Sequence, residues 1–586
     1  MFLAFRPAPK GENDTTDDSR KPGRGRNHQY RPQITNSQLA LVYYTILIHA
    51  LGLIFPVRLC WAIRSTIKDL KFAQIRKVTL RRPTSKAHFR TIERGLGYED
   101  SITSDCSESE IELATESSFT TDSEYEDELL VHAIILPNYK EEMETLRETL
   151  EGLASHQLAR SSYEIYLAME DGEAGAAAKA RALIKEFSKL FRVIDFTLHP
   201  QGIAGEAQGK SSNLCWAARY INGKYTDEKS KQNTIVTIMD SDSHLSSKHF
   251  SLINSLHRAY PETADTTMYV PPIVFDRNAH LVPRLVRVAD ILWAGAGLSG
   301  HYRTSSICPP TSVYSLPLCL IDLAGGWDAG DTAIGEDLHM YIKCFFALNG
   351  NLTTRSVFSP ASHTNVHSSG NGIRGFFEDL NARYKQAMRH MWGALDSGFV
   401  LKSITQLWRA KRVNDKGLPC PPSPYVLLIP DRNSIHWTNT FKLLHRMFEA
   451  HFLPIHLTLL LVVSGLYTLF TPEAQIPRLL LQTLNLTGYV RLLSALNLIY
   501  FFFLYESYHA LCVSSRQVEM SRTGLSNQSF SYRSWRKTGL DFCLFPVAGV
   551  LFGSLPASIA LVCQFWTTKL VYRVSKKPTR GDLAMA

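Results

Sequence analysis

The chain has 586 residues, of which 45% are hydrophobic and 20% charged, and its formal net charge at pH 7 is +9. One compact core rarely accounts for this length, so we expect a large domain together with further segments. The basic residues lie beside apolar runs and do not form an interleaved basic and aromatic groove. This pattern favours a membrane surface, and not nucleic acid, as the anionic partner.

The N-terminal part predicts one membrane span between segments without fixed structure. Residues 1–36 are rich in Gly, Pro, Asp and Arg and are expected to form a disordered basic tail. Residues 37–63 contain the run Leu39–Val57, which carries no charged side chain and is close to the ~20 residues that cross a bilayer. Residues 64–130 are expected to form a basic juxtamembrane segment followed by an acidic disordered linker.

Residues 131–400 alternate apolar strands with helices. Strands are predicted at Val131–Leu136, Tyr163–Met169, Val193–Leu198 and Thr234–Met239, with helices ending near Ser155 and spanning Ala174–Leu190. Continuous apolar strands are typical of parallel sheets that are buried on both faces. Repeated βα units of this kind predict an open α/β sheet with its site at the carboxyl ends of the strands.

The C-terminal part is apolar and ends in basic residues. We expect an interfacial amphipathic segment at 401–451, a transmembrane region at 452–568 and a basic tail at 569–586. Three simple crossings from a cytosolic catalytic domain would place this basic tail outside the cytosol, against the positive-inside tendency. A re-entrant hairpin at Phe542–Thr568, bent near its prolines, would remove the conflict.

Two carboxylates at the end of the fourth predicted strand suggest a metal site. Asp240 and Asp242 are two positions apart where the strand gives way to a loop. Carboxylates so placed can converge on a hard divalent cation such as Mg²⁺ or Mn²⁺. Most short motifs of this kind are solvated loops, so the prediction depends on the motifs that follow.

Two further motifs lie downstream. Glu336 and Asp337 follow Gly335, where a carboxylate can act as general base or occupy the first turn of a helix. Gln386, Arg389 and Trp392, or His390 in place of Trp392, fall on one face of a predicted helix. Arg389 is suited to a pyrophosphate oxygen and Trp392 to stacking on a sugar. A basic amphipathic helix lying on a membrane is the alternative interpretation.

These motifs, in this order, resemble those of the membrane-bound glycosyltransferase family 2 proteins, the group of cellulose, chitin and hyaluronan synthases and ceramide glucosyltransferase. The resemblance extends over about Val131–Gly393. It implies an α/β fold of the GT-A type, a Rossmann-like domain that binds a nucleotide sugar, with flanking transmembrane helices.

The resemblance also implies roles for individual residues. Those expected at the nucleotide sugar are Pro137, Glu141, Glu170 or Asp171, Lys210, Asp240, Gln386, Arg389 and Trp392. Asp240 and Asp242 would coordinate Mn²⁺ or Mg²⁺, and Asp337, with Glu336 beside it, would be the catalytic base. The chain departs from the family in two ways. His390 stands where the family's Gln-x-x-Arg-Trp element has its tryptophan, and the predicted membrane spans are few compared with those of the polymer-extruding synthases.

The expected function is metal-dependent, inverting transfer from a nucleotide sugar, with UDP-sugars favoured, to a polysaccharide or other glycan. Transfer of one sugar to a lipid acceptor stays open, as does a membrane scaffold that kept the fold and lost turnover. The expected partners are the donor, a glycan or lipid acceptor and membrane lipids, without nucleic acid. The protein is expected to be a multi-pass membrane protein with a cytosolic catalytic domain, in the plasma membrane or the Golgi or endoplasmic reticulum.

Overall fold

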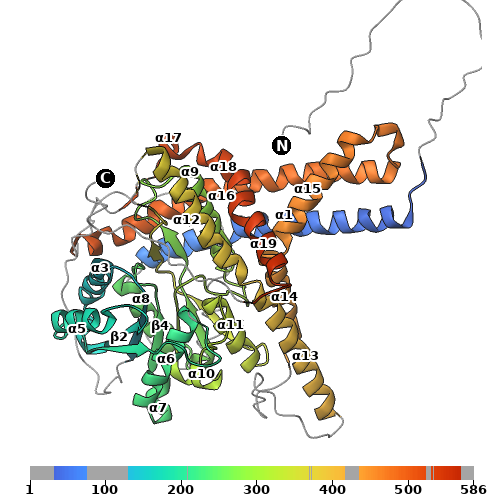
Figure 1. Cartoon of the computed structure of the whole chain (residues 1–586). Helices are drawn as coiled ribbons and strands as arrows, with labels where there is room; N and C mark the ends of the chain where they lie inside the picture. Colours follow the sequence, from blue (N-terminus) through green and yellow to red (C-terminus); the bar gives the residue numbers. More distant parts are fainter. Residues whose placement is uncertain are drawn as a thin grey trace, which may run out of the picture.

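The computed structural model describes residues 32–75, 130–207, 209–368, 370, 372–415, 435–522, 530–531 and 533–568. Residues 1–31 of the predicted N-terminal tail, the whole predicted C-terminal tail and most of the predicted linker therefore lie outside the described residues. Figure 1 shows an α/β domain from which a group of long helices extends to one side.

The centre of the domain is a seven-stranded sheet in the order β3-β2-β1-β4-β7-β5-β8. The four predicted strands are confirmed and pair in parallel; they are β1 (Val131–Asn138), β2 (Tyr163–Glu170), β3 (Val193–His199) and β4 (Thr234–Ile238). The other three are short: β5 (Thr267–Val270), β7 (Tyr314–Pro317) and β8 (Thr353–Ser356). β7 runs antiparallel to both β4 and β5, and β6 (Ile273–Phe275) pairs with β9 (Ala361–His363) in a separate ribbon.

Alternate residues of β1 point into two different cores, as the period of a strand requires. Ile134 and Leu136 belong to the core that includes α3 (Met143–Ala154), α5 (Ala176–Phe187) and α9 (Arg284–Leu298). Ala133 and Ile135 belong to the other core, which contains α6 (Lys210–Lys224), α10 (Leu318–Leu323), α11 (Glu336–Ala347), α13 (Leu395–Asp415) and α14 (Trp437–His451). The remaining short elements are α4 (Ala159–Ser162), α7 (Glu228–Gln232), α8 (Ser247–Ala259) and η1 (Ala264–Thr266).

The predicted boundary at residue 400 does not separate two cores. Leu443 and Met447 of α14 are buried in the same cluster as Phe345 of α11. α14 therefore completes the core of the α/β domain, and an interfacial position of 401–451 stays a prediction.

Two helices are much longer than the bilayer is thick. α1 (Asn36–Ile75) has 40 residues and α16 (Arg478–Arg522) has 45, which at 1.5 Å per residue is about twice the ~30 Å hydrocarbon core. Their first halves extend from the domain together with α15 (Leu453–Phe470) (Figure 1). Their later turns bring Leu59 and Phe501 into the core of the domain. The helix predicted at 37–63 thus continues to Ile75.

The predicted hairpin at Phe542–Thr568 is wrong. α18 (Asp541–Gly549), the π-helical turn η3 (Val550–Ser554) and α19 (Leu555–Cys563) form one continuous helix. A proline ring clashes with the carbonyl four residues before it in an α-helix. The wider π turn directly precedes Pro556 and accommodates it, so the chain continues without reversing. This helix and α1, α15 and α16 are the four described helices that are long and apolar enough to cross a membrane.

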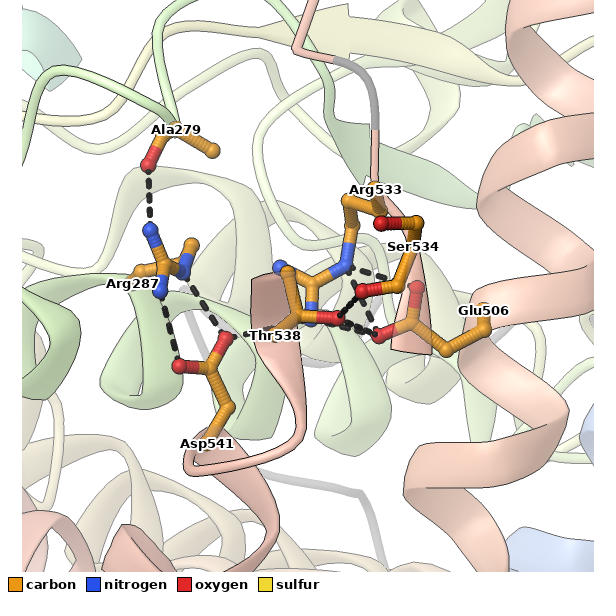
Figure 2. A network of polar contacts seen from close by, with 7 residues as sticks. All are labelled: Ala279, Arg287, Glu506, Arg533, Ser534, Thr538 and Asp541. Atoms are coloured by element: carbon orange, nitrogen blue, oxygen red, sulfur yellow. Dashed lines mark hydrogen bonds and ion pairs between the residues drawn. The ribbon is translucent and has the colours of Figure 1, made fainter. Parts of the chain in front are cut away.

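Both ends of this last helix are bonded to the α/β domain. At its start, Asp541 accepts two hydrogen bonds of 2.8 Å from Arg287 of α9, and Arg533 joins Asp541 to Glu506 of α16 (Figure 2). The short helix α17 (Trp535–Thr538) contributes Thr538 to the same network. At its end, Thr568 is held by Trp392 and Asp331. Both ends of this helix therefore lie next to the α/β domain, and neither end lies at the far end of the extended helices.

Candidate active site

A cavity of about 1450 Å³ opens at the carboxyl ends of the parallel strands. Ten of the residues expected at the site line it: Pro137, Glu141, Glu170, Lys210, Asp240, Asp242, Glu336, Asp337, Gln386 and Arg389. They come from the ends of β1, β2 and β4, the first turns of α6 and α11, and the helix α12 (Gly372–Trp392). The fold thus brings together motifs that are up to about 250 residues apart, as expected for open α/β sheets.

The candidate metal ligands differ in their surroundings. Asp240 is partly exposed and accepts a hydrogen bond of 2.6 Å from Ser312, whereas the residue Asp242 is only 3% exposed and its carboxylate accepts one from Thr364. The backbone carbonyl of Asp242 is also held, at 2.9 Å, by the buried guanidinium of Arg277. These contacts fix both carboxylates at the edge of the cavity.

The two carboxylates suit a magnesium or manganese ion. Such ions bind oxygen, and often take one or two protein carboxylates with phosphate and water completing the shell. Among the described residues no group of three His, Cys, Asp or Glu side chains could hold a metal. Asp240 and Asp242 would thus be the protein ligands of a cation whose remaining ligands are phosphate and water oxygens.

Lys210 connects the two acidic motifs. Its ammonium nitrogen lies 2.9 Å from a carboxylate oxygen of Asp240 and 2.9 Å from one of Glu336. Burial alone would lower the pKa of Lys210, but the carboxylates of Asp240, Glu336 and Asp337 outweigh burial and raise it. The second oxygen of Glu336 accepts hydrogen bonds from Tyr314 and Trp327. Both carboxylate oxygens of Glu336 thus have partners, one in Lys210 and the other in Tyr314 and Trp327. Asp337 is therefore the better candidate for a base.

The pKa of the Asp337 carboxyl group is moved toward neutrality. Burial, and then the negative charges of Glu336 and Asp240 against the opposing charge of Lys210, raise the pKa of Asp337 to about 7. It sits in the first turn of α11, and one of its oxygens accepts the Leu338 amide at 2.9 Å. A carboxyl group with such a pKa can take up and release a proton near neutral pH.

α12 is anchored by a buried ion pair. Arg383 lies 2.7 Å from Asp290 of α9, and both are about 2% exposed. This pair sets the rotation of α12, so that Gln386, Arg389 and His390 face the cavity. The side-chain oxygen of Gln386 and Nδ1 of His390 are buried and have no hydrogen-bond partner among the residues described. Both atoms are available to the hydroxyl groups of a bound sugar.

Two expected residues are not part of the cavity. Trp392 is 4% exposed, and its indole nitrogen donates to the backbone carbonyl of Thr568 at 3.0 Å. The ring packs against the segment that follows the last helix, so the structure does not bring Trp392 together with the other expected residues. Of the alternatives Glu170 and Asp171, only Glu170 lines the cavity, and Asp171 is exposed outside it.

An aromatic side chain is supplied to the cavity from a different helix. Trp293 of α9 lines the cavity and stacks on His390, with ring centroids 4.2 Å apart and an angle of 22° between the planes. Burial and the nearby Arg389 and Arg383 lower the pKa of His390, so its ring is neutral at pH 7. Trp293 thus stacks on the histidine that stands, in the sequence, where the family's motif has a tryptophan.

Sequence reasoning missed several supporting residues. Ser312 has a φ of 141°, which few residues other than glycine adopt, and its hydroxyl holds Asp240. Strained backbone of this kind is concentrated at functional sites. Ser312, Thr364 and Arg277 lie on connecting segments far from Asp240 in the chain, and no local pattern marks them. Trp293 lies in an apolar helix, where an aromatic residue is usually a core residue.

The fold and the cavity define the class of protein: an α/β domain whose strand ends present paired carboxylates, a lysine and a near-neutral carboxyl group. Residues 235–506 match the sequence model of the family described as Glycosyl transferase family group 2. This match identifies the protein as a glycosyltransferase with a family 2 domain in this part of the chain. No curated protein matches the chain.

Two solved structures that are similar to this chain at low identity illustrate the comparison. The mannosyltransferase PcManGT from Pyrobaculum calidifontis, in complex with GDP-Man and Mn²⁺, is 13% identical with a TM-score of 0.34, covering 63% of this chain and 86% of that one. S. aureus TarS 1–349 in complex with UDP is 13% identical with a TM-score of 0.31, covering 67% and 92%.

Proposed function

We propose that the protein transfers a sugar, with inversion, from a nucleoside diphosphate sugar to the hydroxyl group of a glycan or lipid acceptor. The observation that carries the proposal is the bridge of Lys210 between Asp240 and Glu336, next to Asp337. This bridge supports the proposal because it would bring a diphosphate-binding edge and a candidate base into one cavity.

The donor would lie along the carboxyl ends of the strands. Pro137, Glu141 and Glu170 line the part of the cavity at β1 and β2, and these residues would contact the base and ribose. Lys210 and Arg389 would supply positive charge to the diphosphate, Arg389 in a forked contact. A bound Mn²⁺ or Mg²⁺ held by Asp240 and Asp242 would neutralise charge on the leaving diphosphate.

The role proposed for Asp337 is to activate the acceptor hydroxyl group. Asp337 would accept the proton of the acceptor hydroxyl while its oxygen forms a bond to the anomeric carbon. The bond from that carbon to the diphosphate oxygen breaks on the opposite face, and the nucleoside diphosphate leaves. Displacement in one step inverts the anomeric configuration. Retention of Asp240, Asp242, Asp337 and Arg389 supports an enzyme over an inactive scaffold.

We further propose that the protein is a multi-pass membrane protein whose catalytic domain faces the cytosol. Four long apolar helices support membrane insertion. Basic residues near α1 and in the C-terminal part support the cytosolic side, following the positive-inside tendency.

The test is nucleotide release by the full-length protein in nanodiscs. The protein would be incubated with UDP- and GDP-sugars in the presence of Mn²⁺, Mg²⁺ or EDTA. We expect release of one nucleoside diphosphate, with UDP favoured, only when a divalent cation is present. Release of none from any donor would refute the proposal, and release unaffected by EDTA would refute the metal.

A further inference from the structure

The cavity does not end at the catalytic carboxylates. It continues between α1, α15, α16 and the helix formed by α18 and η3. We call this part the membrane crevice, and its apolar lining is Phe55, Leu453, Leu457, Leu498, Phe545 and Val550. Every one of these residues lies on a helix that is long and apolar enough to cross a membrane.

The size of the cavity leaves room for a second substrate beside the donor. Its volume of about 1450 Å³ exceeds the ~300–1,000 Å³ that is usual for a site holding one small molecule. The donor is expected at the polar end, where Lys210 and Asp240 lie. The membrane crevice is the remaining part, and a single cavity connects it to Asp337.

The polar atoms of the membrane crevice are already occupied. The Thr458 hydroxyl donates to Ser554 at 2.9 Å, and the Ser554 hydroxyl donates to the backbone carbonyl of Pro454 at 3.1 Å. The many hydroxyl groups of a sugar chain would find few partners here, and an unpartnered buried hydroxyl costs about 1–3 kcal/mol. An apolar chain has no such cost, because it carries no hydrogen-bonding group that would be left without a partner.

The crevice is also open along one helix. Gly549 and Gly553 line it, and a Cβ atom added at either would meet no atom within 4 Å. Val550, between them on the π turn, lines the crevice and is 46% exposed. The crevice therefore has a side opening on a surface formed by membrane helices.

We propose that the acceptor is an amphiphilic lipid with a free hydroxyl headgroup. Its apolar chain lies in the membrane crevice, and its hydroxyl reaches Asp337. This inference rests on the proposed function and decides between its two acceptor classes. In the reaction, the lipid oxygen bonds to the anomeric carbon, the bond to the nucleoside diphosphate breaks, and the lipid proton passes to Asp337.

The first experiment asks where the transferred sugar goes. The full-length protein, extracted in polymer-bounded native nanodiscs that retain its own membrane lipids, would receive Mn²⁺ and radiolabelled UDP- and GDP-sugars. We expect the label in the phase extracted by chloroform and methanol. Label confined to water-soluble or insoluble polymer, with nucleotide released, overturns the lipid acceptor and leaves the proposed function standing. Absence of any nucleotide release overturns the proposed function itself.

The second experiment obstructs the crevice. Gly553→Phe and Gly549→Phe should lower lipid labelling at least tenfold while Mn²⁺-dependent UDP binding is unchanged. Val547→Phe is the matched control, because Val547 is on the same helix, 52% exposed and outside the cavity lining. Equal labelling by the glycine variants and the control overturns the assignment.

A third measurement does not depend on how the variants fold. Wild-type protein in nanodiscs of phosphatidylcholine doped with a diazirine-bearing diacylglycerol would be irradiated and digested. Cross-links should map to the peptide around Phe545 and Val550. Cross-links restricted to the outer faces of α15 and α16 overturn the inference.

Discussion

At the scale of single residues, the ionisation of Asp337 decides whether the site can act as a base. Its pKa is raised to about 7 by burial and by Glu336 and Asp240, against Lys210. A protonated carboxyl group cannot accept the acceptor proton, so kcat/KM should fall as the pH decreases below about 7 and level off above it. A profile of kcat/KM between about pH 5 and 9 measures this. A profile that is flat through pH 7 would show that another group is the base.

Trp293 lines the cavity, whereas the expected Trp392 does not. The ring of Trp293 stacks on His390. Replacing it by alanine removes an aromatic face worth about 1 kcal/mol, so Trp293→Ala should raise the acceptor KM roughly fivefold. UDP binding should not change.

The control for this variant is Trp408→Ala, since Trp408 of α13 is 48% exposed and lies outside the cavity lining. An acceptor KM that is the same in both variants would exclude Trp293 from acceptor recognition.

At the scale of elements, the network of Figure 2 holds the last helix on α9. Asp541 is fully buried, and Asp541→Asn would leave Arg287 without its carboxylate, at a cost of about 3–5 kcal/mol. Thermal unfolding of the purified protein should show a clear fall in Tm.

An exposed ion pair provides the comparison. In α12, Arg374 and Glu378 form a pair whose side chains are 90% and 42% exposed. Arg374→Gln should cost less than about 1 kcal/mol. If Asp541→Asn lowered Tm no more than Arg374→Gln, the network would not be what holds the last helix.

The elements differ in how far the sequence predicted them. β1 to β4 are apolar runs of five to eight residues bounded by turns, and their positions were clear. β5, β7 and β8 have four residues each and carry no periodicity of their own, because their strand conformation depends on pairing with distant strands. The hairpin was wrong because two prolines were taken as chain reversals, whereas a π turn accommodates one of them.

The site residues also differ in how far the sequence predicted them. Asp240, Asp337 and Arg389 were predictable because each motif is local and the fold brings such strand ends together. Ser312, Thr364 and Trp293 were not, since their roles arise only from contacts across the fold. The position of Trp392 outside the cavity was not predictable either, because its place on the helix face does not show its contact with Thr568.

At the scale of the whole molecule, the last helix determines where the chain ends relative to the membrane. Both of its ends are bonded to the α/β domain, at Arg287 and at Trp392. The turn Thr471–Pro477, between α15 and α16, lies at the far end of the extended helices. We therefore expect an epitope at the C-terminus to lie on the same side of the membrane as the catalytic domain, and one inserted after Glu473 to lie opposite.

Protease protection in sealed microsomes measures this arrangement. Fragments of the catalytic domain and the C-terminal epitope should be cut together, and the inserted epitope should be protected. Protection of the C-terminal epitope while the catalytic domain is digested would contradict it and would indicate a last helix that crosses the bilayer.

The proposed reaction depends on two carboxylates with different roles in one cavity, Asp240 at the diphosphate and Asp337 at the acceptor. The most direct test measures Mn²⁺-dependent binding of UDP and sugar transfer on the same preparations of Asp240→Asn and Asp337→Asn. We predict that Asp240→Asn loses metal-dependent binding, and that Asp337→Asn binds UDP as wild type does while transfer falls at least a hundredfold. Transfer by Asp337→Asn at the wild-type rate, or unchanged binding by Asp240→Asn, would contradict it.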